Sequence, residues 1–330
     1  MTRFPITTAT AVAAVVVVFV LAVGAGAAVG VIARPSPTPA PTPVYTPAPS
    51  PTPEDTGPLL FQQPLSSGCA TSDDVFDVSN GGGIGRFDGQ RWQLIDSTLR
   101  SLVDAGCTRT TLVAVGGAGR ILTVDGVGKT IRADDVGFVD FNGVSILPDG
   151  ALVVGSQGTV DRQTAAGWLP YAQGITEDLF GVVGFSGTSA WAVGSGGVSY
   201  RLEADGWHQQ ETGTTAALRT VSGASGSDAV AAGDDGVLLR FDGKWRPLDS
   251  GVRTALRAST RAGGVTYVVG DGGVVLQITG ADVAKLDLGT SCAITGTFAR
   301  GAEVWFVGSE GTNAGVWRKQ GERIDRWGTC

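Results

Sequence analysis

Short runs of alternating and β-branched apolar residues, separated by clusters of Gly, Asp and Ser, recur along the chain and predict β-strands joined by tight turns. One copy occupies residues 218–245. It predicts an inner strand, a second strand that ends in a Gly-x-x-Gly turn, a third strand that runs into Asp-Gly, and an outer strand opened by a tryptophan. Apolar runs within these strands indicate that both faces of each small sheet are buried.

The second glycine of this turn returns at a nearly constant interval, and its positions are Gly82, Gly119, Gly158, Gly197, Gly236, Gly273 and Gly311. A repeat of about 40 residues in which each copy contains several short strands is typical of β-propeller blades and not of helical solenoids. The sequence therefore predicts an all-β fold, a seven-bladed β-propeller. The tryptophans that recur at one phase of the repeat are expected to fill the slots between blades and not to stack on carbohydrate; they are Trp92, Trp168, Trp207 and Trp245.

Composition divides the chain into an N-terminal segment at 1–34, a Pro/Thr-rich linker at 35–58 and the propeller at 59–330. Residues 5–33 carry no charge and are long enough to cross a bilayer of about 30 Å. We therefore expect a single-pass anchor in the plasma membrane with the propeller on the extracytoplasmic side. A cleaved signal peptide is the alternative, because residues 25–27 fit the small-x-small cleavage rule.

Charge and cysteines narrow the function further. The net charge of −7 includes no long basic run, which argues against nucleic-acid binding. Nucleotide-loop motifs are incomplete, and no cofactor is expected.

The four cysteines form two pairs that are each separated by one repeat length and share a repeat phase. We therefore predict disulfides Cys69–Cys107 and Cys292–Cys330, the second of which would join the two ends of the ring where it closes. A metal site is not expected, because no Cys-x-x-Cys occurs and His208 is the only histidine.

From about residue 70 onward, the segments 190–197, 229–236, 86–92 and 240–245 resemble the repeats of bacterial BNR/Asp-box-like propellers. They are similar to YVTN/WD40-like blades and to propellers of the photosystem II assembly-factor type. The sixth repeat departs from the pattern at 279–282, and the seventh has a short insertion at 312–314. The resemblance implies a disc that scaffolds other proteins without chemistry of its own.

A set of residues follows the first apolar residue of the inner strands and is expected to converge near the mouth of the central channel: Arg100, Asn142, Phe180, Arg219 and Arg257. Clustered guanidinium groups would favour a carboxylate-bearing partner. Acids in the Gly-x-x-Gly turns on the same face, such as Asp234 and Asp271, are interpreted as turn residues and not as calcium ligands.

Two function classes follow. The first is a membrane-tethered, extracytoplasmic scaffold that binds a protein or an envelope polymer, an acidic one in particular, without catalysis. The alternative is a sialidase-like glycan hydrolase, because Asp-box-like repeats also occur in that class. Such an enzyme would need a tyrosine nucleophile with an acidic partner, and the repeats hold only Tyr171, Tyr200 and Tyr267.

Overall fold

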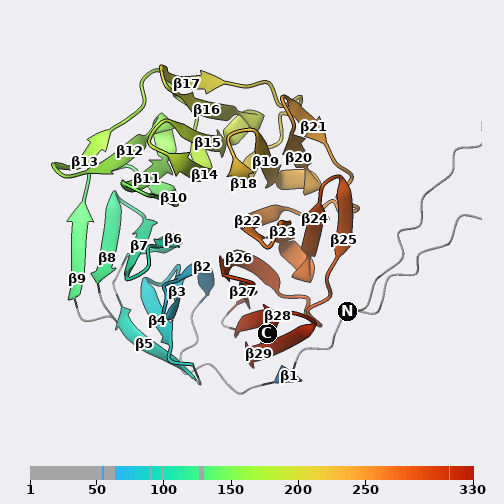
Figure 1. Cartoon of the computed structure of the whole chain (residues 1–330). Helices are drawn as coiled ribbons and strands as arrows, with labels where there is room; N and C mark the ends of the chain where they lie inside the picture. The colour runs from blue at the N-terminus through green and yellow to red at the C-terminus, as the bar shows by residue number, and fades with distance from the viewer. Residues whose placement is uncertain (1–53, 56–63, 90, 98–99, 126–129, 312) are drawn as a thin grey trace, which may run out of the picture. The chain divides into compact units, whose positions relative to one another are not determined.

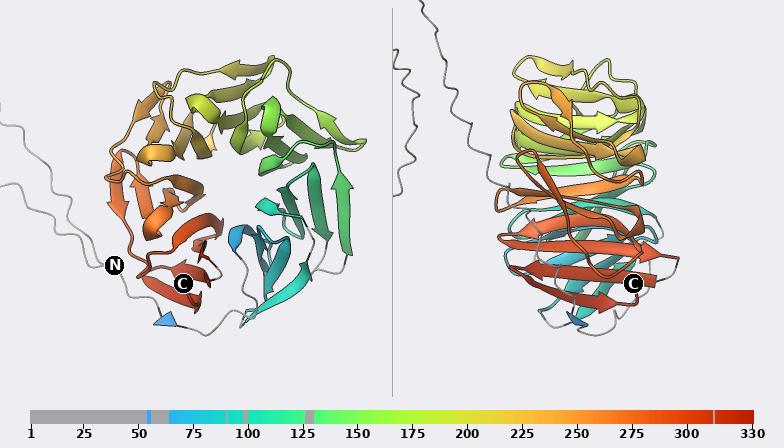
Figure 2. Two further views of the ribbon diagram at one scale, coloured as in Figure 1. Left: turned by 180° about the vertical axis from the view of Figure 1, so that it is seen from behind. Right: turned by 90° about the vertical axis from the view of Figure 1, so that its right-hand side faces the viewer.

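The computed structural model describes residues 54–55, 64–89, 91–97, 100–125, 130–311 and 313–330. Figure 1 shows seven small sheets arranged around a central axis, and Figure 2 shows the same ring from behind and edge-on. Each sheet has four antiparallel strands that follow one another in the chain, and one sheet carries a fifth strand. The predicted all-β, seven-bladed propeller is confirmed.

The strands take four places in each blade, in chain order from the axis outward. The inner strands are β2 (Leu65–Ala70), β6 (Leu102–Cys107), β10 (Phe141–Leu147), β14 (Leu179–Ser186), β18 (Leu218–Ser225), β22 (Leu256–Ala262) and β26 (Ala293–Arg300). The second strands are β3 (Val75–Ser79), β7 (Thr111–Gly116), β11 (Gly150–Gly155), β15 (Ser189–Gly194), β19 (Asp228–Gly233), β23 (Val265–Gly270) and β27 (Glu303–Glu310).

The third strands are β4 (Gly83–Phe87), β8 (Arg120–Asp125), β12 (Val160–Thr164), β16 (Ser199–Glu203), β20 (Leu238–Phe241), β24 (Val275–Thr279) and β28 (Asn313–Gln320). The outer strands are β5 (Trp92–Ser97), β9 (Thr130–Asp135), β13 (Gly167–Pro170), β17 (Gly206–Gln209), β21 (Trp245–Pro247), β25 (Asp282–Lys285) and β29 (Arg323–Gly328). Short 3₁₀ turns η1 (Ser156–Gly158), η2 (Ser195–Gly197), η3 (Asp234–Gly236) and η4 (Asp271–Gly273) join second to third strands in blades 3 to 6.

The repeated glycines make these turns possible. Gly197 has φ of 74°, and a Cβ there would lie 2.2 Å from the carbonyl oxygen of Thr214. Gly194, at the end of β15, would bring a Cβ within 2.1 Å of the carbonyl oxygen of Asp178. The two glycines therefore approach the loops that lead into their own blade and into the next blade too closely for any side chain.

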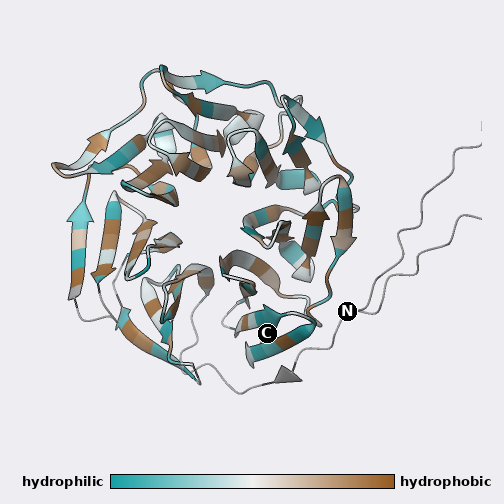
Figure 3. Ribbon diagram, viewed as in Figure 1, coloured by the Kyte–Doolittle hydropathy of each residue, from teal (hydrophilic) through white to brown (hydrophobic). Residues whose placement is uncertain are grey.

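Apolar side chains between blades form the core. The middle strands carry most of the hydrophobic residues, whereas the outer strands β17 and β21 are mainly hydrophilic (Figure 3). Trp92 and Trp245 are buried between blades, and Trp168 and Trp207 are partly buried against the same kind of cluster. The repeating tryptophans fill inter-blade slots, as the sequence predicted.

The ring closes without a strand shared between the first and last blades, since all four strands of each blade are consecutive. Instead, strand β1 (Glu54–Asp55), which the sequence placed in the linker, pairs in parallel with the outer edge of β29. Blades 7 and 1 also share an apolar cluster that includes Trp305, Trp327 and Phe87.

Both disulfides have the predicted pairing, with Cα–Cα distances of 5.5 Å for Cys69–Cys107 and 5.9 Å for Cys292–Cys330. The first links the inner strands β2 and β6 of adjacent blades. The second does not cross the seam as expected, because Cys292 precedes β26 and Cys330 follows β29 of the same blade. It therefore ties the C-terminus to the inner end of blade 7.

None of the helices within the described residues has the length and apolar character required to cross a bilayer. The expected anchor at residues 5–33 and most of the Pro/Thr-rich linker lie outside the described residues.

Candidate functional site: the central channel

A β-bulge occurs near the start of every inner strand and turns one residue per blade toward the axis. The register of each inner strand shifts there against the second strand, as between Leu218 and Thr220. Bulges commonly redirect a side chain in this way. The seven bulge residues line a cavity of about 360 Å³ along the axis and are called the bulge ring here: Ser66, Val103, Asn142, Phe180, Arg219, Arg257 and Thr295.

Four of the five predicted site residues belong to the bulge ring, but Arg100 does not. Strand β6 begins at Leu102, which pairs with Gly116 as Leu218 pairs with Gly233, so the residue equivalent to Arg219 is Val103. Arg100 lies before the strand, is exposed, and has Nη1 3.3 Å from Oδ1 of Asp135.

The misplacement of Arg100 arose because the dipeptide 99–100 imitates Leu218–Arg219 in sequence. The distance to the turn glycine is the signal that could have corrected it. Leu102 lies as many residues before Gly116, which ends the second strand of its blade, as Leu256 lies before Gly270. Leu218 lies only one residue further before the corresponding Gly233. The same count would also have found Ser66, Val103 and Thr295, which the sequence analysis missed.

Arg219 is held in a fixed orientation by the turn of its own blade. Its Nε and Nη2 donate to the two carboxylate oxygens of Asp234 at 2.9 and 2.7 Å. These hydrogen bonds are the main reason that the pKa of Asp234 is lowered and that of Arg219 raised. The guanidinium also lies over the ring of Phe180, 4.6 Å from its centroid, which adds a cation–π contact with blade 4.

Arg257 repeats the arrangement in the next blade. Its Nε and Nη2 donate to Asp271, the second of these bonds at 2.9 Å. Asn142 instead donates from Nδ2 to the carbonyl oxygen of Leu179 at 2.9 Å and thereby ties blade 3 to blade 4. Two arginines of the bulge ring are therefore neutralised by acids of the turns, and each keeps its Nη1 donors outside the pair.

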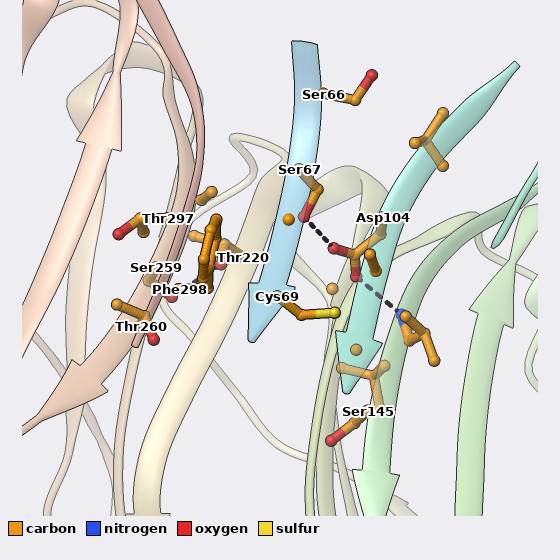
Figure 4. A pocket seen from close by; sticks show the side chains of 18 of the residues that line it. Ser66, Ser67, Cys69, Asp104, Ser145, Thr220, Ser259, Thr260, Thr297 and Phe298 are labelled. Carbon is orange, nitrogen blue, oxygen red and sulfur yellow. Dashed lines mark hydrogen bonds between the residues drawn. The ribbon is translucent and has the colours of Figure 1, made fainter. Parts of the chain in front are cut away.

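Deeper in the channel, Asp104 connects three blades (Figure 4). Its Oδ1 accepts a hydrogen bond from Ser67 Oγ of blade 1 at 2.8 Å, and its Oδ2 accepts one from the backbone N–H of Val144 in blade 3 at 2.9 Å. Burial raises the pKa of Asp104, while the hydrogen bonds from Val144 and Ser67 act in the opposite direction. This carboxylate is a structural link between inner strands.

Other hydroxyl groups link neighbouring blades around the channel. Thr220 and Ser259 join blades 5 and 6 through their hydroxyl oxygens at 2.8 Å. Thr295 Oγ1 donates to the carbonyl oxygen of Leu65 at 2.7 Å and joins blade 7 to blade 1. The wall of the channel is thus polar, and much of its hydrogen-bonding capacity serves the ring itself.

A tyrosine–carboxylate pair exists, but its surroundings do not suit a nucleophile. Tyr200 Oη donates to Glu177 Oε2 at 3.0 Å, and the Tyr200 side chain is buried in the apolar cluster between blades 3 and 4. Burial and the carboxylate raise the pKa of Tyr200 to about 12. Tyr200 does not line the channel cavity where Arg219 and Arg257 lie.

One exposed group of potential metal ligands lies away from the channel on the β16–β17 hairpin, where ligand atoms of Glu203, Asp205 and His208 are within 4.8 Å of one another. His208 Nε2 is 2.8 Å from Asp205, and Arg201 is 3.3 Å from Glu203. The hydrogen bond between His208 and Asp205 and the ion pair between Arg201 and Glu203 account for this group.

Comparison with known proteins identifies the fold. No protein-family model matches the chain, and no curated protein matches it. A crystal structure of the WD40 β-propeller domain of Doa1 is similar over 79% of this chain and 95% of that domain, with a TM-score of 0.67 and 14% identity. A structure of YCF48 bound to D1 peptide is similar over 82% of each chain, with a TM-score of 0.54 and 15% identity. The protein therefore has the seven-bladed propeller fold that WD40 domains and YCF48 share, the type its repeats resemble.

Proposed function

We propose that the protein is a non-catalytic scaffold that binds a segment of a protein partner at the bulge ring. The observation that carries this proposal is the pair of arginines, Arg219 and Arg257, held at the channel by Asp234 and Asp271. An arginine that already makes a two-pronged ion pair is pre-organised, so a partner does not have to order it.

The remaining donors define the partner's chemistry. Each guanidinium has five N–H donors, of which its aspartate takes two. A carbonyl or carboxylate of an extended segment can accept from the others, while Phe180 offers an aromatic surface beside Arg219. An acidic peptide segment fits this combination. An acidic envelope polymer offers the same hydrogen-bond acceptors, but the aromatic ring of Phe180 suits it less well than it suits a peptide.

The comparisons support a protein partner through fold alone. The YCF48 structure contains a bound D1 peptide, so a propeller of similar fold can bind a peptide. We further propose that residues 5–33 anchor the chain in the plasma membrane and that the propeller acts on the extracytoplasmic side, where its two disulfides would persist.

Cross-linking in native membranes, followed by mass spectrometry, tests the binding proposal. The double variant Arg219→Ala/Arg257→Ala should lose the cross-linked partner. The matched control Arg91→Ala/Arg246→Ala removes two arginines whose ion pairs with Asp88 and Asp242 lie on outer hairpins, and it should keep the partner. Equal recovery from both variants would refute binding at the bulge ring.

Carbonate extraction tests the proposed membrane anchor. It should leave the full-length chain in the membrane pellet and release a chain that lacks residues 5–33.

Incubation with fluorogenic glycosides tests the non-catalytic role. Fluorogenic sialosides and other glycosides should remain intact with the purified protein. Turnover that the variant Tyr200→Phe abolishes would replace the scaffold proposal with a hydrolase.

A further inference from the structure

A groove separate from the channel lies at the rim between blades 4 and 5, beside β20 and β21, which are labelled in Figure 1. The loop 211–214 that leads from β17 to β18 forms one wall, and β20, β21 and the end of η3 form the other. The cavity measures about 600 Å³, enough for a long side chain and part of its backbone.

The floor of the groove is apolar and lies beside the outer strand of blade 5. Strand β21 has three residues and ends at Pro247, after which the N–H of Leu248 donates to the carbonyl oxygen of Leu238 at 2.9 Å. The groove is lined there by Val237, Trp245, Pro247 and Leu248. Trp245 is held in place by a hydrogen bond from its Nε1 to Ser199 Oγ at 3.1 Å.

Three exposed carboxylates surround this floor, from Glu211, Asp235 and Asp249, against a single cation, Lys244. The lining therefore carries a net charge of −2, three acids less one base. Asp249 accepts a hydrogen bond from the N–H of Gly251 at 2.9 Å. Within the described part of the chain, Glu211 and Asp235 have no arginine or lysine within ion-pair distance.

Lys244 does not sit at the same end of blade 5 as Asp235. Asp235 lies in the turn before β20, and Lys244 lies in the turn after it. The acidic end of the groove is thus the end at the Gly-x-x-Gly turns.

We propose that this groove binds an arginine or lysine side chain from an extended segment of a partner protein. The aliphatic stem lies on Trp245, Pro247 and Leu248, and the cationic head reaches Glu211 and Asp235. Long basic side chains combine an apolar stem with a charged end, which matches this lining. The site is independent of the bulge ring, since it takes the opposite charge and shares no residue with it.

Saturation-transfer NMR on the full-length chain in detergent tests the proposal with two matched probes, acetyl-Gly-Arg-Gly-amide and the same peptide with citrulline in place of arginine. Citrulline keeps the shape of arginine and removes its charge. We expect the arginine probe to bind about fivefold more tightly, which corresponds to about 1 kcal/mol for partly exposed charge pairs. Absence of binding of the arginine probe at millimolar concentration, or equal binding of the two, would refute the proposal.

The double variant Glu211→Gln/Asp235→Asn locates the binding site. Asp235 has φ of 58°, a conformation that asparagine adopts readily, so the substitution preserves the turn. This variant should bind the arginine probe about fivefold more weakly. The control Asp282→Asn/Glu322→Gln removes two exposed acids from blades 6 and 7 and should bind it like the wild type. Equal affinity in Glu211→Gln/Asp235→Asn and the wild type would place the cation elsewhere. The variant Arg219→Ala/Arg257→Ala should still bind the probe, which separates this result from failure of the bulge-ring proposal.

Discussion

Ser67 of blade 1 donates a hydrogen bond to Asp104 of blade 2 at 2.8 Å, and the same carboxylate accepts the N–H of Val144 in blade 3. Adjacent to this link, Cys69 and Cys107 join the same two inner strands covalently. The inner edges of the first three blades are therefore cross-connected at the channel, where the strands of different blades share no backbone ladder.

Replacement of Asp104 by Ala should destabilise the ring, because the N–H of Val144 and the hydroxyl of Ser67 both lose their acceptor. We expect a loss of about 1–3 kcal/mol in the free energy of unfolding, measured in urea. Asp73→Ala, at an exposed turn of blade 1, is the control and should change stability little. An Asp104→Ala variant as stable as the control would show that the three-blade link contributes nothing.

Asp77 should make stability fall as pH rises. Its side chain is fully buried in β3, and burial raises its pKa to about 8, although the N–H of Gly85 donates to Oδ1. The unfolded state binds fewer protons than the folded state between the ordinary carboxyl pKa and this raised value. The free energy of unfolding should therefore decrease by up to about 1.4 kcal/mol per pH unit over that interval and level off above it.

The variant Asp77→Asn tests this prediction, because it keeps an acceptor for Gly85 and cannot titrate. Thermal unfolding between pH 6 and pH 9 should show a shallower decline for Asp77→Asn than for the wild type. Parallel curves would mean that Asp77 is ionised in the folded protein or that its burial has no thermodynamic effect.

The two disulfides should contribute similarly to the free energy of unfolding, because both enclose loops with the same sequence separation of 38. Loop-closure entropy predicts about 3–4 kcal/mol for each. We expect Cys69→Ala/Cys107→Ala and Cys292→Ala/Cys330→Ala to lose comparable stability in urea. A loss confined to one pair would show that the position of the bond, between blades or within blade 7, outweighs the loop it closes.

A single substitution in the blade 2 turn should stabilise the protein. Ala118 has φ of 54°, a conformation that is strained for alanine but not for glycine, and Asp140 Oδ1 accepts its N–H at 2.8 Å. Ala118→Gly should raise the free energy of unfolding by about 0.5–1 kcal/mol.

The reverse change, Gly197→Ala, should destabilise the protein, since the Cβ of the new alanine would meet the carbonyl oxygen of Thr214. The melting temperatures of Ala118→Gly and Gly197→Ala should therefore move in opposite directions from the wild type. If both fell, the left-handed conformation of the turn would not be the source of strain at Ala118.

The repeat allowed most of the architecture to be predicted, and errors entered where the repeat is imperfect. The glycine spacing gave the number of blades, and the shared phase of the cysteines gave their pairing. Arg100 was misplaced because a leucine–arginine pair occurs shortly before the buried Leu102 that begins β6. Strand β1 was missed because two acidic residues in a proline-rich stretch carry no strand pattern.

The sequence by itself determined the fold, because the turns of the repeat require glycine and its middle strands require apolar residues on both faces, and these demands recur once in every blade. Only the tertiary structure decided what the polar side chains do. Asp234 holds Arg219 because the turn folds back onto the inner strand of its blade, and Asp104 joins three blades because inner strands meet at the axis. Periodicity reports which positions are buried within one blade, whereas these pairings depend on how turns and neighbouring blades approach one another in space.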